Sequence, residues 1–325
     1  MIHKQYTAVV TGGAGFIGSH LCERLLNEGF KVVNIDNFND YYCPSIKHDN
    51  IRGAMNSENY FSCSGDIRDI AFLDHVFAAH NPDVVIHLAA MAGVQPSLEN
   101  PELYYDVNVN GTLQLLQSCV KSSISKVVFA SSSSVYGNNQ TPFKESDNTD
   151  LSVSPYASSK KAGEVLCHVY HHLHNISIHC LRFFTVVGPR QRPDLAVHKF
   201  VKAILSGQPV QLRGDLNSSR DYTSVYDTVD GIMGSIRRLL SEKKHEYKIY
   251  NLGNSYPVSL GDMLQTIEEI LGKKADVEYV DFMKGDVDST YADISLANAD
   301  LGYRPQRSFK DAVVSFVDWY EEYIY

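Results

Sequence analysis

A tyrosine and a lysine four residues apart, Tyr156 and Lys160 in the stretch SPYASSKKAGE, are the first residues whose spacing suggests chemistry. On a helix, positions four apart lie on one face, so the two side chains can act on the same substrate. A tyrosine beside a cation can serve as an acid and base, because the positive charge favours the phenolate. Since this spacing also arises by chance in a chain with 20 tyrosines, the neighbouring motifs must support it.

Four consecutive serines, residues 131–134, directly follow an apolar run, KVVFA, that reads as a buried strand. A short serine run can be a flexible linker. Here it ends a predicted core strand, and open α/β sheets bind ligands beyond the carboxyl ends of their strands. We therefore expect these hydroxyls to line the same site as Tyr156 and Lys160.

A glycine-rich turn, TGGAGFIGSH, follows the first predicted strand, with Gly12, Gly15 and Gly18 in the spacing GxxGxxG. The first glycine permits a tight turn, the second lets backbone approach a pyrophosphate, and the third lets the helix pack closely on the strand. The phosphate then lies at a helix N-terminus. Asp36 ends the second predicted strand, where it can accept hydrogen bonds from ribose hydroxyls and would repel a 2′-phosphate. The pattern therefore predicts NAD rather than NADP, and the alternative is a glycine turn without a ligand.

Apolar runs that suit buried parallel strands alternate with helix-length segments through the first part of the chain. The predicted strands are residues 7–10, 31–35, 83–87, 126–129 and 176–181, and the helices include 19–28 and 112–121. This alternation predicts an α/β fold with a Rossmann-type doubly wound parallel sheet. After Phe183 the alternation becomes irregular and Gly, Pro, Arg and Asp become frequent, which predicts a smaller second α/β domain.

Composition excludes several classes of protein. The 325 residues, 44% of them hydrophobic, can bury a large core, and a net charge of −9 argues against general nucleic-acid binding. No window approaches about 18 uninterrupted apolar residues, so we expect no membrane partner and no secretion. The six cysteines form no CxxC pair, which predicts reduced thiols in a cytoplasm. We interpret the histidine cluster at 168–179 as a helix surface, because His168 and His172 alone would not complete a metal's coordination shell.

Several motifs together resemble the extended short-chain dehydrogenase/reductases, and specifically their nucleotide-sugar epimerases. They are TGGAGFIG, HLAA at 87–90, NVNGT at 108–112, SSSSVYG and YASSK. The stretches IDNFNDYY at 35–42, SLENP at 97–101 and RFFTVVGPRQRPD are similar to those of UDP-glucuronate 4-epimerases. The resemblance implies NAD as cofactor, a UDP-sugar substrate and a homodimer, for which the helices near 112–121 and 156–170 carry apolar residues. It also implies an NAD-binding domain of residues 1–183 and 218–254, and a nucleotide-sugar domain of residues 184–217 and 255–325.

The resemblance also implies roles for individual residues. Ser132 would hydrogen-bond the sugar hydroxyl that is oxidised, and Tyr156 would be its acid and base, assisted by Lys160. The cofactor-binding candidates, which include Tyr156 and Lys160, are otherwise Gly12, Gly15, Phe16, Ile17, Gly18, Asp36, Asn37, Asp66, Ile67, Leu88, Ala89, Ala90 and Asn108. The substrate-binding candidates are Ser133, Ser134, Thr185, Arg192, Arg220 and Asp286, of which the two arginines would bind phosphate through their guanidinium forks.

The same positions separate the alternatives. Related dehydratases carry an Asp-Glu pair, and related decarboxylases a Glu, where this chain has Ser133 and Ser134, so we predict C4 epimerisation. Gln95 and Val187 depart from the uronate epimerase pattern, and the small Thr290 at a gate position would admit a 2-acetamido sugar. UDP-glucose and UDP-N-acetylglucosamine therefore stay open as substrates. A non-catalytic NAD-sensing protein is a further alternative, which the retained Ser132, Tyr156 and Lys160 argue against.

Overall fold

Seven parallel strands form the central sheet of the protein, in the order β10-β6-β5-β4-β1-β2-β3. The computed structural model describes residues 4–242, 244–280 and 287–324. The strands of this sheet are β1 (Thr7–Thr11), β2 (Lys31–Asp36), β3 (Tyr60–Ser64), β4 (Val84–His87), β5 (Lys126–Ser132), β6 (Ser177–Phe183) and β10 (Tyr247–Leu252). The five predicted strands and the Rossmann-type sheet are confirmed. The two strands that the sequence did not predict, β3 and β10, lie at the edges, where burial demands no long apolar run.

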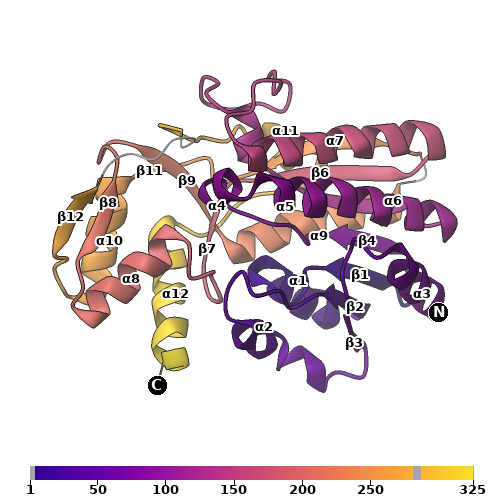
Figure 1. Cartoon of the computed structure of the whole chain (residues 1–325), viewed down its shortest axis with the longest axis horizontal. Helices are drawn as coiled ribbons and strands as arrows, with labels where there is room; N and C mark the ends of the chain where they lie inside the picture. The colour runs from indigo at the N-terminus through magenta and orange to yellow at the C-terminus, as the bar shows by residue number, and fades with distance from the viewer. Residues whose placement is uncertain (1–3, 243, 281–286, 325) are drawn as a thin grey trace.

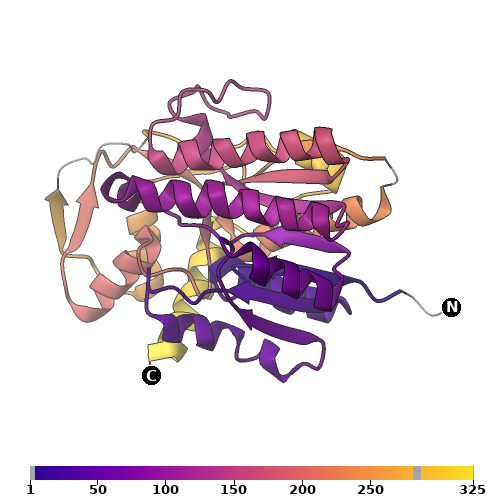
Figure 2. The ribbon, with the colours of Figure 1, turned by 45° about the vertical axis from the view of Figure 1, so that its right-hand side comes forward.

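Helices cover both faces of this sheet, which gives three layers (Figures 1 and 2). One face is covered by α1 (Phe16–Asn27), α2 (Pro44–Ile51), α9 (Val225–Ser241) and α11 (Ser295–Leu301). The other face is covered by α3 (Ile70–His80), α6 (Gly111–Lys121) and α7 (Pro155–His174), with the short α4 (Val94–Glu99) and α5 (Pro101–Tyr105) beside them. Each interface has its own buried apolar core, built for example around Leu21 and Val10 on one side and Leu115 and Val9 on the other.

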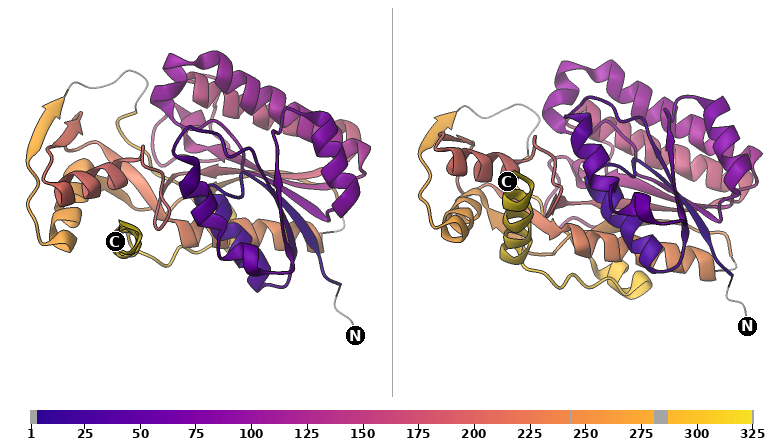
Figure 3. Two further views of the ribbon diagram at one scale, coloured as in Figure 1. Left: turned by 60° about the horizontal axis from the view of Figure 1, so that its bottom comes forward. Right: turned by 90° about the horizontal axis from the view of Figure 1, so that it is seen from below.

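A second lobe lies beside the carboxyl edge of the sheet (Figures 1 and 3). Its strands are β7 (Thr185–Val187), β9 (Ser219–Ser224) and β11 (Pro257–Ser259) in one sheet, and β8 (Val210–Arg213) and β12 (Val277–Val280) in another. Its helices are α8 (Ala196–Ser206), α10 (Leu260–Leu271) and α12 (Phe309–Ile324). This lobe has a separate core that includes Phe200, Met263 and Phe316, so it is a second packing unit rather than an extension of the first.

The packing differs from the predicted domain boundaries at two points. Strand β9 pairs with β7 and β11, so residues 219–224 belong to the second lobe's sheet. Helix α11 and Tyr303 pack against α9 in the core of the larger unit. The chain therefore passes between the two lobes more often than the predicted domain boundaries imply.

In the described part of the chain, no helix is long and apolar enough to span a bilayer. Within the same residues, no group of three or more His, Cys, Asp or Glu side chains is arranged to hold a metal ion. His168 and His172 lie exposed on α7.

Candidate active site

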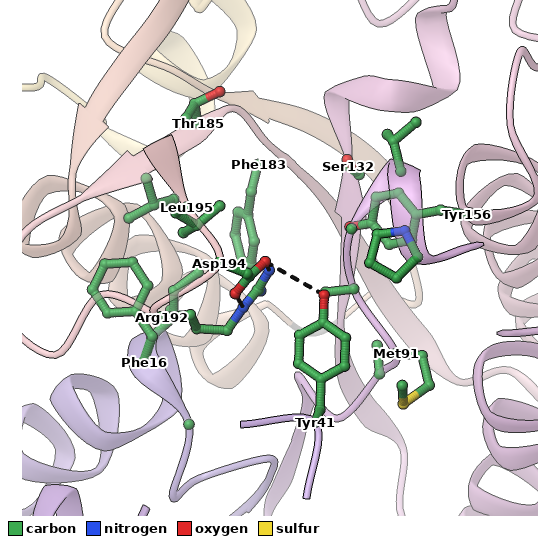
Figure 4. Close-up of a pocket in the computed structure, with 18 of the residues that line it drawn as sticks. Phe16, Tyr41, Met91, Ser132, Tyr156, Phe183, Thr185, Arg192, Asp194 and Leu195 are labelled. Atoms are coloured by element: carbon green, nitrogen blue, oxygen red, sulfur yellow. Dashed lines mark hydrogen bonds and ion pairs between the residues drawn. The ribbon is translucent and has the colours of Figure 1, made fainter. Parts of the chain in front are cut away.

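A cavity of about 1040 Å³ lies between the carboxyl ends of the central strands and the second lobe. It is lined by residues from both lobes, and Figure 4 shows part of it. The predicted catalytic and cofactor-binding residues line this one cavity, with the exception of Asn108. Of the substrate-binding candidates, Ser133, Ser134, Thr185, Arg192 and Arg220 line it as well, and Asp286 lies outside the described residues.

The glycine turn has the backbone geometry that a dinucleotide requires. Gly12 has a positive φ of 71°, and its carbonyl accepts from Gly15 N–H at 3.1 Å, which closes the turn. Its own N–H donates to the Ile35 carbonyl at 2.7 Å and continues the pairing of β1 with β2. A Cβ at Gly18 would overlap the carbonyl oxygen of Gly12, so only glycine allows α1 to pack this closely. Because α1 begins at Phe16, directly after Gly15, its free N–H groups face the cavity wall where a pyrophosphate would lie.

Asp36 closes the adenosine end of this site. Its side chain is held by two backbone groups, because Ala14 N–H donates to Oδ2 at 3.1 Å and Phe38 N–H donates to Oδ1 at 2.9 Å. A carboxylate has about four acceptor positions, so two bonds leave room for the ribose hydroxyls. Asn37 and Asp66, which hydrogen-bond each other at 3.1 Å, line the cavity beside it. These residues fit NAD.

Asn108 supports the cofactor wall from behind. Its Oδ1 accepts from Met91 N–H at 2.8 Å, and its Nδ2 donates to the Met91 carbonyl and to Ser159 Oγ, both at 2.9 Å. The side chain thereby ties the segment after β4, which contains Leu88, Ala89 and Ala90, to α7. The sequence motif located Asn108 near the cofactor, but the residue acts in this structure as a positioning residue and not as part of the cavity lining.

The three predicted catalytic side chains converge at one edge of the sheet. Ser132 is the last residue of β5, Tyr156 stands in the first turn of α7, and Lys160 follows one turn later. Helix α7 starts here because Ser154 caps it, accepting from Ala157 N–H at 3.1 Å, and Pro155 occupies the first position.

Lys160 is buried, and its Nζ donates to the Ala130 carbonyl at 2.8 Å. Burial lowers the pKa of Lys160 to about 8. Burial has the opposite effect on Tyr156 and raises its pKa, because the charged form of a tyrosine is the deprotonated one. A hydrogen bond with Ser132 and the charge of Arg192 lower that pKa. The cation that lowers the pKa of Tyr156 in this structure is thus Arg192, whereas the resemblance implied assistance from Lys160.

The four serines have different surroundings. Ser131 Oγ donates to Glu164 Oε1 at 2.6 Å, and Glu164 forms a buried ion pair with Arg182 at 2.8 Å. Ser134 N–H donates to Ser132 Oγ at 3.1 Å, which fixes the start of the 3₁₀ turn after β5. Ser131 therefore anchors the end of β5, and the following hydroxyls are held at the cavity wall.

The substrate candidates come from the second lobe and the segments that lead into it. Arg220 on β9 donates from Nη1 to the carbonyls of Ser219, at 2.9 Å, and Asp288, at 3.2 Å. Thr290 lines the cavity and accepts from Asp221 N–H at 3.0 Å. Val187, by contrast, is fully buried in the core of the second lobe, so its departure from the motif changes packing and leaves the cavity wall unaltered.

Sequence reasoning did not name several charged or polar residues of the cavity, among them Tyr41, Asp194 and Arg213. Tyr41 OH donates to Asp194 Oδ2 at 3.4 Å across two segments far apart in the chain. Tyr41 and Asp194 lie inside the motifs IDNFNDYY and RQRPD. These two motifs contributed to the family resemblance. The contact between them could not be predicted from the sequence, because it depends on tertiary packing.

Comparisons with known proteins agree with this arrangement. A UDP-glucuronate 4-epimerase of Thermodesulfobacterium geofontis is 40% identical over 317 residues, covering 97% of this chain and 96% of its own length. The crystal structure of the UDP-glucuronic acid 4-epimerase of Bacillus cereus with UDP-glucuronic acid and NAD superposes with a TM-score of 0.92 at 35% identity, covering 98% and 100% of the two chains. A UDP-glucose 4-epimerase of Thermotoga maritima with UDP-glucose superposes with a TM-score of 0.89 at 27% identity, covering 98% and 100%.

A Rossmann-type sheet with this glycine turn and a serine, tyrosine and lysine at its carboxyl edge is the architecture of an extended short-chain dehydrogenase/reductase. Within that class, the chain belongs to the family described as GDP-mannose 4,6 dehydratase, whose profile matches residues 9–316.

Proposed function

We propose that this protein is an NAD-dependent UDP-sugar 4-epimerase that interconverts UDP-glucuronate and UDP-galacturonate. The observation that carries the proposal is the convergence of Ser132, Tyr156 and Lys160 in one cavity with the dinucleotide turn. Relatives and structural neighbours named as UDP-glucuronate 4-epimerases support it.

In the part of the chain that the structure describes, the cavity lining lacks the groups that a dehydratase would need. Elimination of water requires an additional acid and base beside the sugar. Among the described residues that line the cavity, the carboxylates are Asp36, Asp66 and Asp194. Asp36 ends β2 and Asp66 follows β3, both at the adenosine end, and Asp194 is paired with Arg192. Ser133 and Ser134 supply hydroxyls where the dehydratases carry their acidic pair, so epimerisation fits better.

Each of the site residues would have its own role in the proposed reaction. Bound NAD would supply a hydride acceptor and donor at C4 of the sugar. Ser132 would orient the 4-hydroxyl, and Tyr156 would take its proton when C4 is oxidised. After the 4-keto sugar turns over, Tyr156 would return the proton when C4 is reduced on the opposite face. Lys160 and Arg192 favour the phenolate that this cycle requires.

Hydroxyl groups suit a substrate that must turn over within the site. Ser133, Ser134 and Thr185 line the cavity, and neutral donors can bind a carboxylate without the rigidity of a bidentate arginine. UDP-glucose is one alternative substrate, supported by the structural neighbour from Thermotoga maritima. UDP-N-acetylglucosamine is another, supported by the small Thr290 at the cavity wall.

Incubation of the purified protein with UDP-glucuronate, without added NAD, tests the proposal. We expect UDP-galacturonate to appear and NAD to be released when the protein is denatured. Absence of both C4 interconversion and bound nicotinamide nucleotide would contradict it. A parallel incubation with UDP-glucose separates the two substrate assignments.

The proposed homodimer would use α6 and α7, which lie side by side on one outer face (Figures 1 and 2). Val165 and Leu173 on α7 are 52% and 63% exposed, whereas Leu116 on α6 is fully buried in the core. A pair of exposed apolar residues on one helix supports a docking face. Light scattering at micromolar concentration should give a dimer mass, and Val165→Asp should shift it towards the monomer.

A further inference from the structure

A buried ion pair lies behind the serine segment, by which we mean residues 131–136. Glu164 on α7 and Arg182 on β6 have side chains that are 1% and 2% exposed, and neither is among the described residues that line the cavity. Arg182 Nε donates to Glu164 Oε1 at 2.8 Å, and Arg182 Nη2 donates to Glu164 Oε2 at 2.9 Å. A bidentate pair of this kind fixes both side chains in one geometry.

The sheet register brings this pair to the serine segment. Arg182 is the partner of Ser131 in the parallel pairing of β6 with β5, so both side chains leave the same face of the sheet. Helix α7 covers that face, and it presents Tyr156, Lys160 and Glu164 at successive turns, four residues apart. Glu164 therefore belongs to the same helix side as the two predicted catalytic residues of α7.

The ion pair contacts both ends of the serine segment. At the start, Ser131 Oγ donates to Glu164 Oε1 at 2.6 Å. At the end, the ring of Tyr136 packs on the guanidinium, with 4.7 Å between Arg182 Cζ and the ring centre, which is a cation–π contact. The Tyr136 hydroxyl is in turn hydrogen-bonded to β10 at 2.6 Å. Ser132 lies between these two contacts.

A separate contact joins α7 to the same strand one residue earlier. Lys160 Nζ donates to the Ala130 carbonyl at 2.8 Å. Helix α7, which carries Tyr156, is therefore joined to the end of β5 at two consecutive residues, Ala130 and Ser131. Ser132 is the next residue, and it lines the cavity together with Tyr156 (Figure 4). The separation of the catalytic serine and tyrosine thus depends on how α7 and β5 are held together.

Directional bonds distinguish this junction from apolar packing. A buried ion pair is a weak source of stability, because desolvation of the two charges offsets most of their attraction. Here Glu164 Oε1 accepts from both Ser131 and Arg182, Oε2 accepts from Arg182, and Lys161 Nζ lies 3.9 Å from Oε2. These bonds fix the direction in which β5 leaves the sheet, which contacts between apolar side chains would specify less sharply.

We propose that Glu164 and Arg182 are positioning residues of the reaction, which hold the serine segment so that Ser132 and Tyr156 meet the same sugar hydroxyl. Neither side chain would touch the sugar, because both lie behind the cavity wall, and their effect reaches the reaction through Ser131 and Ser132. The inference rests on the proposed epimerase function, and it adds to that function two residues outside the cavity.

The first test removes only the hydroxyl that links the strand to the ion pair. Ser131→Ala leaves Glu164 paired with Arg182, so the fold should persist. We expect kcat for UDP-glucuronate to fall about 10- to 100-fold with KM and bound NAD unchanged, the scale of a catalytic group displaced by about 1 Å. Ser131→Thr, which retains the hydroxyl, should restore most of the turnover.

Ser118→Ala is the matched control. Ser118 is fully buried on α6, and its Oγ donates to Asp74 Oδ1 at 2.7 Å. The substitution therefore also removes a buried hydrogen bond from a serine to a carboxylate, but at a residue outside the described cavity lining. Its kcat should equal that of the wild-type protein, and thermal unfolding of both variants shows whether their losses of stability are comparable.

Two further variants test the inference even if Ser131→Ala does not fold. Glu164→Met combined with Arg182→Met leaves no unpaired charge in the core, and apolar replacement of a buried ion pair commonly preserves stability. Turnover in this double variant should fall by at least the factor expected for Ser131→Ala. In a Ser132→Ala background, Ser131→Ala should lower kcat no further, because the ion pair acts through Ser132.

Three results would overturn the inference. They are an unchanged kcat in Ser131→Ala or in the double methionine variant, an equal fall of kcat in Ser118→Ala, and full additivity of Ser131→Ala with Ser132→Ala. Failure of the proposed function gives a different result, because the wild-type protein with bound NAD would then epimerise neither UDP-glucuronate nor UDP-glucose.

Discussion

The cofactor half and the sugar half of the cavity are built on different principles. In the cofactor half, the backbone determines the shape of the site. Gly12 and Gly18 allow the tight turn, and two backbone N–H groups hold Asp36 in place. In the sugar half, a side-chain pair, Arg192 with Asp194, is supported by a third side chain from a distant segment. A backbone-built site tolerates little change in its glycines, whereas a side-chain-built site can alter its substrate through single substitutions.

The largest effect is expected where the two halves meet. Tyr156→Phe removes the acid and base but leaves the glycine turn and Asp36 untouched, so turnover should fall by about two to four decades while NAD stays bound. Steady-state epimerisation, together with nicotinamide content after denaturation, measures both. Near-normal turnover would remove Tyr156 from its role, and loss of NAD would show that the two halves are not separable.

A smaller effect is expected from Arg220→Ala at the second-lobe end of the sugar half. If Arg220 binds the diphosphate that all UDP-sugars share, KM should rise by about 10- to 100-fold for UDP-glucuronate and UDP-glucose alike, the scale of a lost charged hydrogen bond. Substrate kinetics with both sugars check this. A rise confined to one sugar would instead assign Arg220 to the sugar ring.

Gly18→Ala tests the backbone-built half. The added Cβ would overlap the Gly12 carbonyl, so we expect a loss of about 1–3 kcal/mol in the free energy of unfolding and a lower content of bound NAD. Gly53→Ala is the matched control, because its Cβ would meet only the Glu23 side chain at 3.7 Å. Equal stability and NAD content in the two variants would contradict the account of the turn.

The last test concerns a pH dependence of stability in the cofactor half. Burial, assisted by the charge of Lys160, lowers the pKa of His87 to about 3. Burial and the charge of Arg190 lower the pKa of His20 to about 4. Both imidazoles are neutral in the fold but take up a proton when unfolded below pH of about 6.5. Their contribution to stability is therefore complete above that pH and declines as the pH falls from there toward 4, by up to about 1.4 kcal/mol per pH unit for each histidine.

Urea unfolding of the NAD-saturated protein at pH 7.5, 6 and 5 measures this decline. The variant His20→Gln should lose stability less steeply as the pH falls, by about one proton, because glutamine does not titrate. Its amide can still donate to the Pro189 carbonyl that His20 Nε2 contacts at 2.9 Å. Equal slopes in the two proteins would show that His20 is not the titrating group.

The contrast between the halves also explains what the sequence could predict. The glycine turn, Asp36, and the Ser132, Tyr156 and Lys160 positions were identified because each lies at a strand end or helix start within a local motif. The central sheet followed from the same alternation of strands and helices. The edge strands β3 and β10 were not predicted because exposed residues in β3, and the polar Lys248 and Asn251 in β10, interrupt the apolar pattern.

Residues that act through long-range contacts were not predictable in the same way. Tyr41 and Asp194 are separated by about 150 residues in the chain, and no local pattern indicates that they meet. Asn108 was placed at the cofactor by its motif, but only the contacts to Met91 and Ser159 show that it works from behind the wall. Local motifs therefore predicted most of the residues that line the cavity, whereas contacts between distant segments depend on tertiary packing.

The central claim is that one hydride leaves C4 and returns to the opposite face of the same sugar. The most direct measurement uses UDP-glucuronate deuterated at C4, incubated with the purified protein in ordinary water without added NAD, and analyses the UDP-galacturonate by mass spectrometry and NMR. The account predicts that the deuterium is retained at C4 of the product, because the hydride stays within the site. Exchange of that deuterium for solvent hydrogen, or inversion at a carbon other than C4, would contradict it.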